Sequence, residues 1–380
     1  MHICFITSEF PKPGFPHGGV GTFVATLGKV LVKKGIEVSV IGLNYTDEEQ
    51  VENVEGIEVY RVFSKKVKGL QWCFNSKAIA NKIKEIHQIK PFDFVETAEL
   101  GLAFLPKIKG IQYVIRMHGG HHFFAQAENR KKEWWKVLQE KRSFLKADHI
   151  IAVSNYVAET TRLLLKLGNR TIEIIYNPID TNKFYVYDQL KTAKNSIFFA
   201  GTIIEKKGIR QLVQSLNFLV DEFPDVHLYI AGRDANLPGT NLPYRPVLEQ
   251  ELNNKIKKHI TFLGVVPNAE IAHHIERAEV CCYPSHMEAM PLAWLEVMAM
   301  GKAFVGSKTG PGPEAITDKV TGFLVNPYDP KDIAEKIKIL FNNPEKAVAL
   351  GDKARRSVLE KFEINTIVNE NIAFYTRISP

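Results

Sequence analysis

The strongest constraint on the fold is a repeated alternation of short apolar runs with segments of helical pattern. Residues 2–8 form an apolar run, and residues 22–34 repeat apolar side chains at helical spacing before Gly35. A second apolar run follows at 38–42. Runs of this kind are typical of strands buried on both faces of a parallel sheet. The opening of the chain therefore predicts a strand, a helix and a second, parallel strand.

The same alternation continues in two series. Further strands are expected at 58–62, 92–96, 112–116 and 149–153, and then at 196–201, 227–232, 260–264, 280–283 and 303–306. Between the series, Pro178 and several asparagines interrupt the pattern, and a polar stretch continues to about Asn195. We therefore expect an α/β protein of two doubly wound parallel-sheet domains, residues 1–178 and 195–364, with a linker at about 179–194.

Length and composition agree with two such domains. The chain has 380 residues and 45% hydrophobic side chains, enough to form two cores. No apolar run approaches the roughly 20 residues that span a bilayer, and the amino end enters a strand without a charged leader. These observations predict a cytoplasmic protein. The four cysteines show neither C-x-x-C nor disulfide-framework spacing, so we expect them to be buried as small hydrophobic residues.

Two glutamates, Glu288 and Glu296, lie eight positions apart where a loop containing Pro291 leads into an apolar segment. Proline favours the first turn of a helix. A helix beginning there would contain Glu296 and leave Glu288 just before its amino end. Backbone N–H groups between the two carboxylates could then face an anion. The alternative is that both are solvated residues on an amphipathic helix, as most glutamates are.

A glycine cluster, residues 16–21, lies between the first strand and the first helix. Adjacent glycines let backbone N–H groups approach a phosphate without obstruction. Gly18, Gly19 and Gly21 do not supply the G-x-G-x-x-G spacing of a dinucleotide fingerprint. A flexible turn is the other interpretation of this cluster.

Three histidines follow the predicted strand 112–116. His118 stands at the strand's carboxyl end beside two glycines, where an imidazole can hydrogen-bond a substrate hydroxyl. His121 and His122 are adjacent, and on a strand they would point to opposite faces without a carboxylate or cysteine to complete a ligand set. We therefore expect no metal site. In the second series, Lys207 precedes a helix and could neutralise the negative charge of a bound phosphate group.

Residues 288–301 resemble the E-x7-E signature of retaining GT-B glycosyltransferases, specifically glycosyltransferase family 4 (glycosyl transferases group 1). The resemblance extends from the Gly18-Gly19 loop to residues 322–325. It implies two Rossmann-like domains facing a central cleft, with a last helix at about 365–380 packing back on the first domain. It also implies retention of anomeric configuration and no metal. It implies no cofactor either, because the nucleotide-sugar donor would be a substrate.

The resemblance also implies roles for individual residues. It makes His118, Lys207 and Glu288 the catalytic residues. It assigns donor binding to Gly18, Gly19, Thr202, Arg233, Val266, Ala289, Met290, Pro291, Leu292 and Glu296. Thr202 stands where the family usually carries an arginine. Another cation would therefore have to bind the phosphates of the donor. Lys206, Arg210 and Arg233 are candidates to replace that arginine, although Lys206 and Arg210 could equally be surface charges.

The acceptor is the least constrained partner. Residues 129–138 combine a basic cluster with Trp134 and Trp135 in a region predicted to be helical. Such a stretch can lie at an anionic membrane surface, where lipid-linked acceptors reside. A surface helix with inward aromatics is the alternative. We expect a nucleotide-sugar donor, a glycan or lipid-linked acceptor, and no nucleic acid. The process would be the assembly of cell-envelope polysaccharide or glycolipid, at the inner face of the membrane if the protein is peripheral.

Three other functions remain open at this point. A nucleotide-sugar epimerase of the same fold would need no acceptor, but the match of Glu288 and Glu296 to family 4 disfavours it. A nicotinamide-dependent oxidoreductase also uses paired α/β domains, and the missing G-x-G-x-x-G after the first strand counts against it. An inactive sugar-binding scaffold is the third, and Thr202 is its only support.

Overall fold

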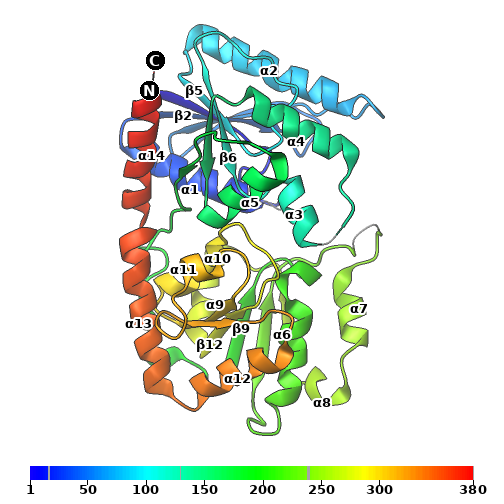
Figure 1. The fold of residues 1–380 in the computed structure, drawn as a ribbon, viewed down its shortest axis with the longest axis vertical. Coiled ribbons are helices and arrows are strands. Elements are labelled where there is room, and N and C mark those ends of the chain that lie inside the picture. The colour runs from blue at the N-terminus through cyan, green and yellow to red at the C-terminus, as the bar shows by residue number, and fades with distance from the viewer. Residues whose placement is uncertain (16–17, 129, 238–239, 380) are drawn as a thin grey trace. The chain divides into compact units, whose positions relative to one another are not determined.

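Two predominantly parallel sheets organise the chain, and each belongs to its own unit (Figure 1). The computed structural model describes residues 1–15, 18–128, 130–237 and 240–379. The first unit contains residues 1–178 and 364–380, and the second contains residues 179–363. The chain therefore leaves the first unit, builds the whole of the second, and returns to the first.

The sheet of the first unit has the order β3-β4-β2-β1-β5-β6-β7-β8. Its strands are β1 His2–Ile6, β2 Glu37–Leu43, β3 Gln50–Val54, β4 Ile57–Val62, β5 Phe94–Thr97, β6 Gln112–Met117, β7 His149–Ala152 and β8 Glu173–Ile174. All pairs are parallel except β3 with β4. The central strand β1 is buried on both faces, as its continuous apolar sequence predicts.

Helices cover this sheet and supply the rest of its core. They are α1 Gly19–Lys33, α2 Gln71–Ile89, α3 His121–Ala127, α4 Trp134–Lys146, α5 Asn155–Leu165 and α14 Ile364–Ile378. In Figure 1, α14 is the red helix at the end of the chain, and it packs against α1. Leu27 and Leu31 of α1 join Ile367 and Val368 of α14 in one buried cluster over the sheet.

A buried polar group fixes α14 to this sheet. Arg116 of β6 donates from Nε to Glu96 of β5 at 2.7 Å, and from Nη2 to the Asn371 side-chain oxygen at 2.6 Å. The Tyr375 hydroxyl donates to the same glutamate at 2.6 Å. All four side chains are at most 2% exposed. Removal of one partner from such a group leaves a buried charge or dipole unsatisfied.

The sheet of the second unit has the order β11-β10-β9-β12-β13-β14 and is wholly parallel. Its strands are β9 Ser196–Ala200, β10 His227–Ala231, β11 Ile260–Gly264, β12 Val280–Tyr283, β13 Ala303–Ser307 and β14 Phe323–Val325. Its helices are α6 Ile209–Ser215, α7 Tyr244–Gln250, α8 Asn254–Lys257, α9 Ile271–Arg277, α10 Leu292–Ala299, α11 Gly312–Ala315, α12 Pro330–Phe341 and α13 Pro344–Lys361. Short 3₁₀ turns complete it at η1 Gln189–Lys191, η2 Glu205–Lys207 and η3 Leu216–Phe218.

The fold class expected from the sequence is confirmed, and the predicted strands are found at the expected places. Three strands, β3, β8 and β14, were not predicted. The predicted linker at 179–194 belongs to the second unit, because its backbone is bonded there. The N–H of Tyr187 donates to the carbonyl of Met300, and that of Ala193 to the carbonyl of Arg277. No helix within the described residues is long and apolar enough to cross a membrane.

Candidate active site

The carboxyl ends of the strands in the second unit bring its candidate residues to one edge of the sheet. Strand β9 lies between β10 and β12, so the loops that follow these three strands are neighbours. Two of these loops touch through their backbones, since a Cβ on Gly232 would lie 1.8 Å from the carbonyl oxygen of Gly201. The N–H of Gly232 also donates to the carbonyl of Gly264 at 2.7 Å. Ligands of open parallel sheets bind at this edge.

Lys207 and Glu288 meet at this edge. Nζ of Lys207, the last residue of η2, lies 2.5 Å from Oε1 of Glu288. The chain turns there because Gly208 has a φ of +68°, and a Cβ at that position would lie 1.9 Å from the carbonyl oxygen of Pro284. The N–H of His286 also donates to the carbonyl of Lys206 at 2.8 Å. These two contacts hold the loops after β9 and β12 together.

Glu296 lies inside α10, and Pro291 directly precedes this helix, as the sequence pattern predicts. Glu296 is buried, and burial raises the pKa of its carboxyl group to about 7, while the nearby Lys183 acts in the opposite direction. This glutamate therefore carries a proton at acidic pH and becomes an anion near neutrality. A carboxyl group of this kind can accept hydrogen bonds from the hydroxyl groups of a ligand.

The remaining predicted donor residues line the same edge. Thr202 follows β9 and is half-buried, Arg233 follows β10 and is exposed, and Val266 follows β11. Ala289 and Met290 lie between Glu288 and α10, and Leu292 is the first residue of that helix. Of the candidates to replace the missing arginine, Arg210 is bound to Glu205 at 2.8 Å and also pairs with Glu251. Arg210 is thus engaged within the protein.

In the first unit, the glycine loop likewise follows the carboxyl end of a strand, β1. Gly18 caps α1, and Gly19 begins it. A Cβ on Gly21 would lie 1.7 Å from the carbonyl oxygen of Glu9, and one on Gly18 would lie 2.3 Å from Oε2 of Glu9. The glycines are therefore needed where the loop after β1 lies against the helix start. Pro16 and His17 of the predicted motif lie outside the described residues.

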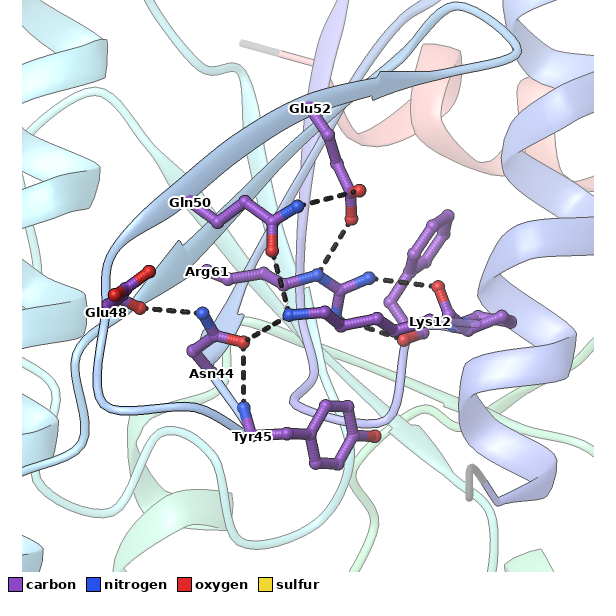
Figure 2. A network of polar contacts seen from close by, with 9 residues as sticks. Lys12, Asn44, Tyr45, Glu48, Gln50, Glu52 and Arg61 are labelled. Atoms are coloured by element: carbon purple, nitrogen blue, oxygen red, sulfur yellow. Dashed lines mark hydrogen bonds and ion pairs between the residues drawn. The ribbon is translucent and has the colours of Figure 1, made fainter. Parts of the chain in front are cut away.

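A polar network supports the loop between β1 and these glycines (Figure 2). Arg61 of β4 is 3% exposed and donates to the carbonyls of Phe10 and Pro11. It also bonds to Glu52 of the unpredicted strand β3 at 2.8 Å. Lys12 donates to the side-chain oxygens of Asn44 and Gln50. The hairpin β3–β4 thus fixes the path of the loop that leads to Gly18.

His118 stands directly after β6 and is partly exposed. Its ring packs edge-on against Phe23 of α1, with 4.9 Å between ring centroids. Burial, together with the charge of Arg116, lowers the pKa of His118 to about 3. The imidazole is therefore neutral at physiological pH, and it can exchange hydrogen bonds with a hydroxyl without acting as a cation.

His121 and His122 begin helix α3, so their expected placement on a strand was wrong. The peptide N–H of Glu133 donates to Nε2 of His121 at 3.0 Å, and Nδ1 of His122 contacts Glu140. Within the residues that the structure describes, no group of three or more histidines, cysteines or acidic residues is arranged to hold a metal ion. Both histidines are engaged by the protein itself.

The basic aromatic stretch differs from the predicted helix. Asn129 lies outside the described residues, residues 130–133 are not helical, and α4 begins only at Trp134. The Trp134 side chain is 75% exposed. Trp135 instead packs against Trp72 of α2, with 5.2 Å between ring centroids. The two tryptophans therefore occupy different environments.

Two residues near the candidate site were missed by sequence reasoning. Glu99 lies two residues beyond β5 and is 4% exposed, beside the turn that carries His118. His118 was selected because it follows the carboxyl end of a predicted strand. Glu99 also follows the end of a predicted strand, so the same argument could have identified it. Glu140, in the middle of α4, has no comparable signal, because its burial depends on how α3 and α4 pack.

The site residues of the second unit combine a cation, an adjacent carboxylate and a buried carboxyl group of raised pKa. A lysine beside a strand-end loop can stabilise negative charge that develops on a departing group. Carboxylates nearby can orient hydroxyl groups. This set of side chains suits the transfer of a polyhydroxylated group from an anionic carrier.

Comparisons with known proteins show the family to which the chain is similar. Residues 187–357 match the model of the family described as glycosyl transferases group 1, and residues 17–183 match the model of Glycosyltransferase Family 4. The capsular polysaccharide biosynthesis glycosyltransferase CapM of Staphylococcus aureus is 24% identical to this chain, and the alignment covers 91% of each protein.

Two solved structures share the fold. Sucrose-phosphate synthase from Thermosynechococcus elongatus superposes with a TM-score of 0.85 at 20% identity, over 99% of this chain and 98% of that one. The Anabaena protein HepE, solved in complex with UDP-glucose, superposes with a TM-score of 0.76 at 16% identity, over all of both chains. The arrangement of two parallel-sheet domains is therefore the GT-B fold.

Proposed function

Because the chain belongs to glycosyltransferase family 4, we propose that it transfers a sugar from a nucleotide-sugar donor to a glycan or lipid-linked acceptor. The proposal includes retention of anomeric configuration and no requirement for a metal. The observation that best supports this proposal is the contact between Lys207 and Glu288, with Glu296 on the helix that follows. Family membership disfavours the oxidoreductase alternative, whose phosphate-binding fingerprint is also missing.

In this proposal the second unit holds the donor. Lys207 stabilises the charge that develops on the leaving diphosphate as the bond to the anomeric carbon breaks. Glu288 balances Lys207 when no donor is bound, and it orients the sugar in the complex. Glu296 accepts hydrogen bonds from the ribose hydroxyls. Because Thr202 replaces the arginine of the usual family pattern, the site has one cation fewer. Lys207 therefore contributes more of the stabilisation of the leaving diphosphate.

In this proposal the first unit holds the acceptor. The Gly18-Gly19 loop offers backbone N–H groups at the start of α1. His118 is neutral, and its position after β6 suits a hydrogen bond to a sugar hydroxyl. The relative CapM is named for capsular polysaccharide biosynthesis, which supports a glycan acceptor of the cell envelope.

Donor binding is the first test of this function. HepE binds UDP-glucose, so we expect calorimetric titration in metal-free buffer to show binding of a nucleotide-sugar and none of NADH. Replacement of Glu296 with alanine should weaken that binding by roughly 1–3 kcal/mol, because buried ribose hydroxyls lose their acceptor. Wild-type affinity should rise as pH increases through about 7, where Glu296 ionises, and the variant should not follow it.

Glu335, an exposed residue of α12, provides the matched control. Its replacement with alanine removes a carboxyl group from the same unit and should leave donor affinity unchanged. Equal affinity of the Glu296→Ala variant and the wild type would remove Glu296 from the donor site. Binding of NADH alone would overturn the transferase.

We further propose that the protein meets its acceptor at an anionic membrane surface. Exposed Trp134 is followed along α4 by exposed Leu138, and Lys131 and Lys132 are exposed just before this helix. Exposed aromatic and aliphatic side chains among lysines suit the interface of an anionic bilayer. Lys65, Lys66 and Lys68 form an exposed basic loop just before α2.

Replacement of Trp134 with serine should reduce sedimentation with anionic vesicles without changing the unfolding midpoint, since this side chain is mostly solvent-exposed. Trp135→Ser is the matched comparison, and it should lower the unfolding midpoint because Trp135 packs against Trp72 and Phe104. Vesicle binding that is unchanged in the Trp134 variant would argue against this surface.

A further inference from the structure

Two buried glutamates flank the turn that follows β6 and carries His118. Glu99 comes from the loop after β5, and Glu140 comes from the middle of α4. Their side chains are 4% and 0% exposed. Within the described part of the chain, Oε1 of each glutamate makes no hydrogen bond to the protein. Two carboxyl groups buried with one unsatisfied oxygen each are costly unless something joins them.

The side chains of both glutamates approach Gly120. A Cβ built on this glycine would lie 1.8 Å from Oε1 of Glu140 and 3.0 Å from Cγ of Glu99. Both side chains thus approach the same point of the backbone, and any residue larger than glycine would collide with them. The unsatisfied oxygen of Glu140 lies at that point.

The two glutamates also hold opposite ends of the turn. The backbone N–H groups of His118 and Gly119 act to lower the pKa of Glu99, against the larger effect of burial. The backbone N–H of His122 donates to Oε2 of Glu140 at 2.9 Å, and its ring Nδ1 contacts the same oxygen. The segment from His118 to His122 therefore lies between the two glutamates and interacts with each of them.

Electrostatic repulsion limits the protonation states that such a pair of buried carboxyl groups can adopt. Two neighbouring carboxylates out of water resist ionising together, so the pKa of one is raised. Burial is the main cause here, and with the charge of Glu140 it raises the pKa of Glu99 to about 8.

The groups that face this pair carry little positive charge to oppose that shift. His118 is neutral at physiological pH, and Arg116 of β6 is paired with Glu96. From α3, burial lowers the pKa of His121, and His122 contacts Glu140 rather than Glu99.

We propose that Glu99 and Glu140 share one proton across Gly120, and that this proton positions the His118 turn for sugar transfer. The carboxylic acid of Glu99 donates its O–H to Oε1 of Glu140, which satisfies the pair. When the proton leaves, two adjacent anions repel each other and release the turn. Both glutamates act here as positioning residues, and their role in transfer rests on the proposed function.

The test compares the wild type with Glu99→Gln, whose amide donates an N–H to Glu140 at every pH. In the wild type, the native state keeps this proton at pH values where the unfolded state has lost it, so stability should fall as pH rises from the ordinary glutamate value of 4.5 to about 8 and should level off above that. In the variant this fall should be absent. An identical pH dependence of the two unfolding curves between pH 6 and 9 would overturn the shared proton. This measurement needs no substrate, so its result does not depend on the transferase activity.

Activity gives the second readout. Above the pKa of Glu99, wild-type kcat/KM should fall about tenfold per pH unit, because the fraction of protonated pairs falls by that factor. Glu99→Gln should flatten this limb, which a merely structural role would not do. If the variant does not fold, an infrared titration decides. In the Glu296→Ala variant, which lacks the other carboxyl group whose pKa is raised to about 7, a protonated-carboxyl band that disappears near pH 8 supports the proposal, and its absence throughout pH 6–9 refutes it.

Discussion

Replacing Lys207 with alanine should lower turnover by about 10²–10³-fold, which is the usual cost of one lost group that stabilises developing negative charge. The loss should fall mainly on kcat, because charge on the leaving diphosphate peaks in the transition state. Steady-state kinetics with a saturating nucleotide-sugar would measure it. Donor affinity, measured separately by calorimetry, should change much less.

The matched control is Lys257→Ala, which removes an exposed lysine of α8 in the same unit. It should leave both kcat and donor affinity unchanged. Losses of equal size in donor affinity and in kcat/KM for Lys207→Ala, with kcat unchanged, would show that Lys207 only holds the ground state. Full activity of that variant would remove Lys207 from the chemistry, and Arg233 would become the next candidate cation.

Replacing Arg116 with methionine should destabilise the first unit by about 3–5 kcal/mol, since the change leaves the carboxylate of Glu96 buried without its cation. Urea unfolding followed by a probe in the first unit would measure this loss. Hydrogen exchange should show that amides of α14 lose protection, because the same arginine holds Asn371.

Two comparison variants separate charge from packing. Tyr375→Phe removes only one hydrogen bond to Glu96 and should cost less, about 1.5–3 kcal/mol. The double change Arg116→Met with Glu96→Leu removes both charges and should recover much of the stability. A double variant that is no more stable than Arg116→Met alone would show that the loss comes from packing.

The strands of both sheets could be predicted from the sequence because parallel strands buried on two faces are continuous apolar runs. Strand β3 was missed because it lacks such an apolar run. It pairs only with β4 at the edge of the sheet, its Gln50–Val54 sequence carries polar residues, and none of its residues is buried. An edge strand of this kind has no sequence pattern that separates it from a loop.

The candidate site was predictable residue by residue but not as a set of contacts. Lys207 and Glu288 are 81 positions apart, and they meet because β9 and β12 are adjacent in the sheet. Strand order depends on how the helices pack across the sheet, and periodicity along the chain does not encode it. The same holds for Arg116 and Asn371, which are 255 positions apart.

The return of the chain to its first unit has a consequence for its synthesis. Residues 179–363 begin and end at the same place, where the N–H of Ile179 donates to the carbonyl of Phe362 at 2.9 Å. A ribosome that has made residues 1–178 has not yet made α14, so the nascent first sheet must wait without a covering for part of its apolar face. The inserted unit has its own sheet and can fold during this interval. Chains that terminate before residue 364 should therefore be recognised by chaperones and proteases as unfinished, even when their second unit is fully folded.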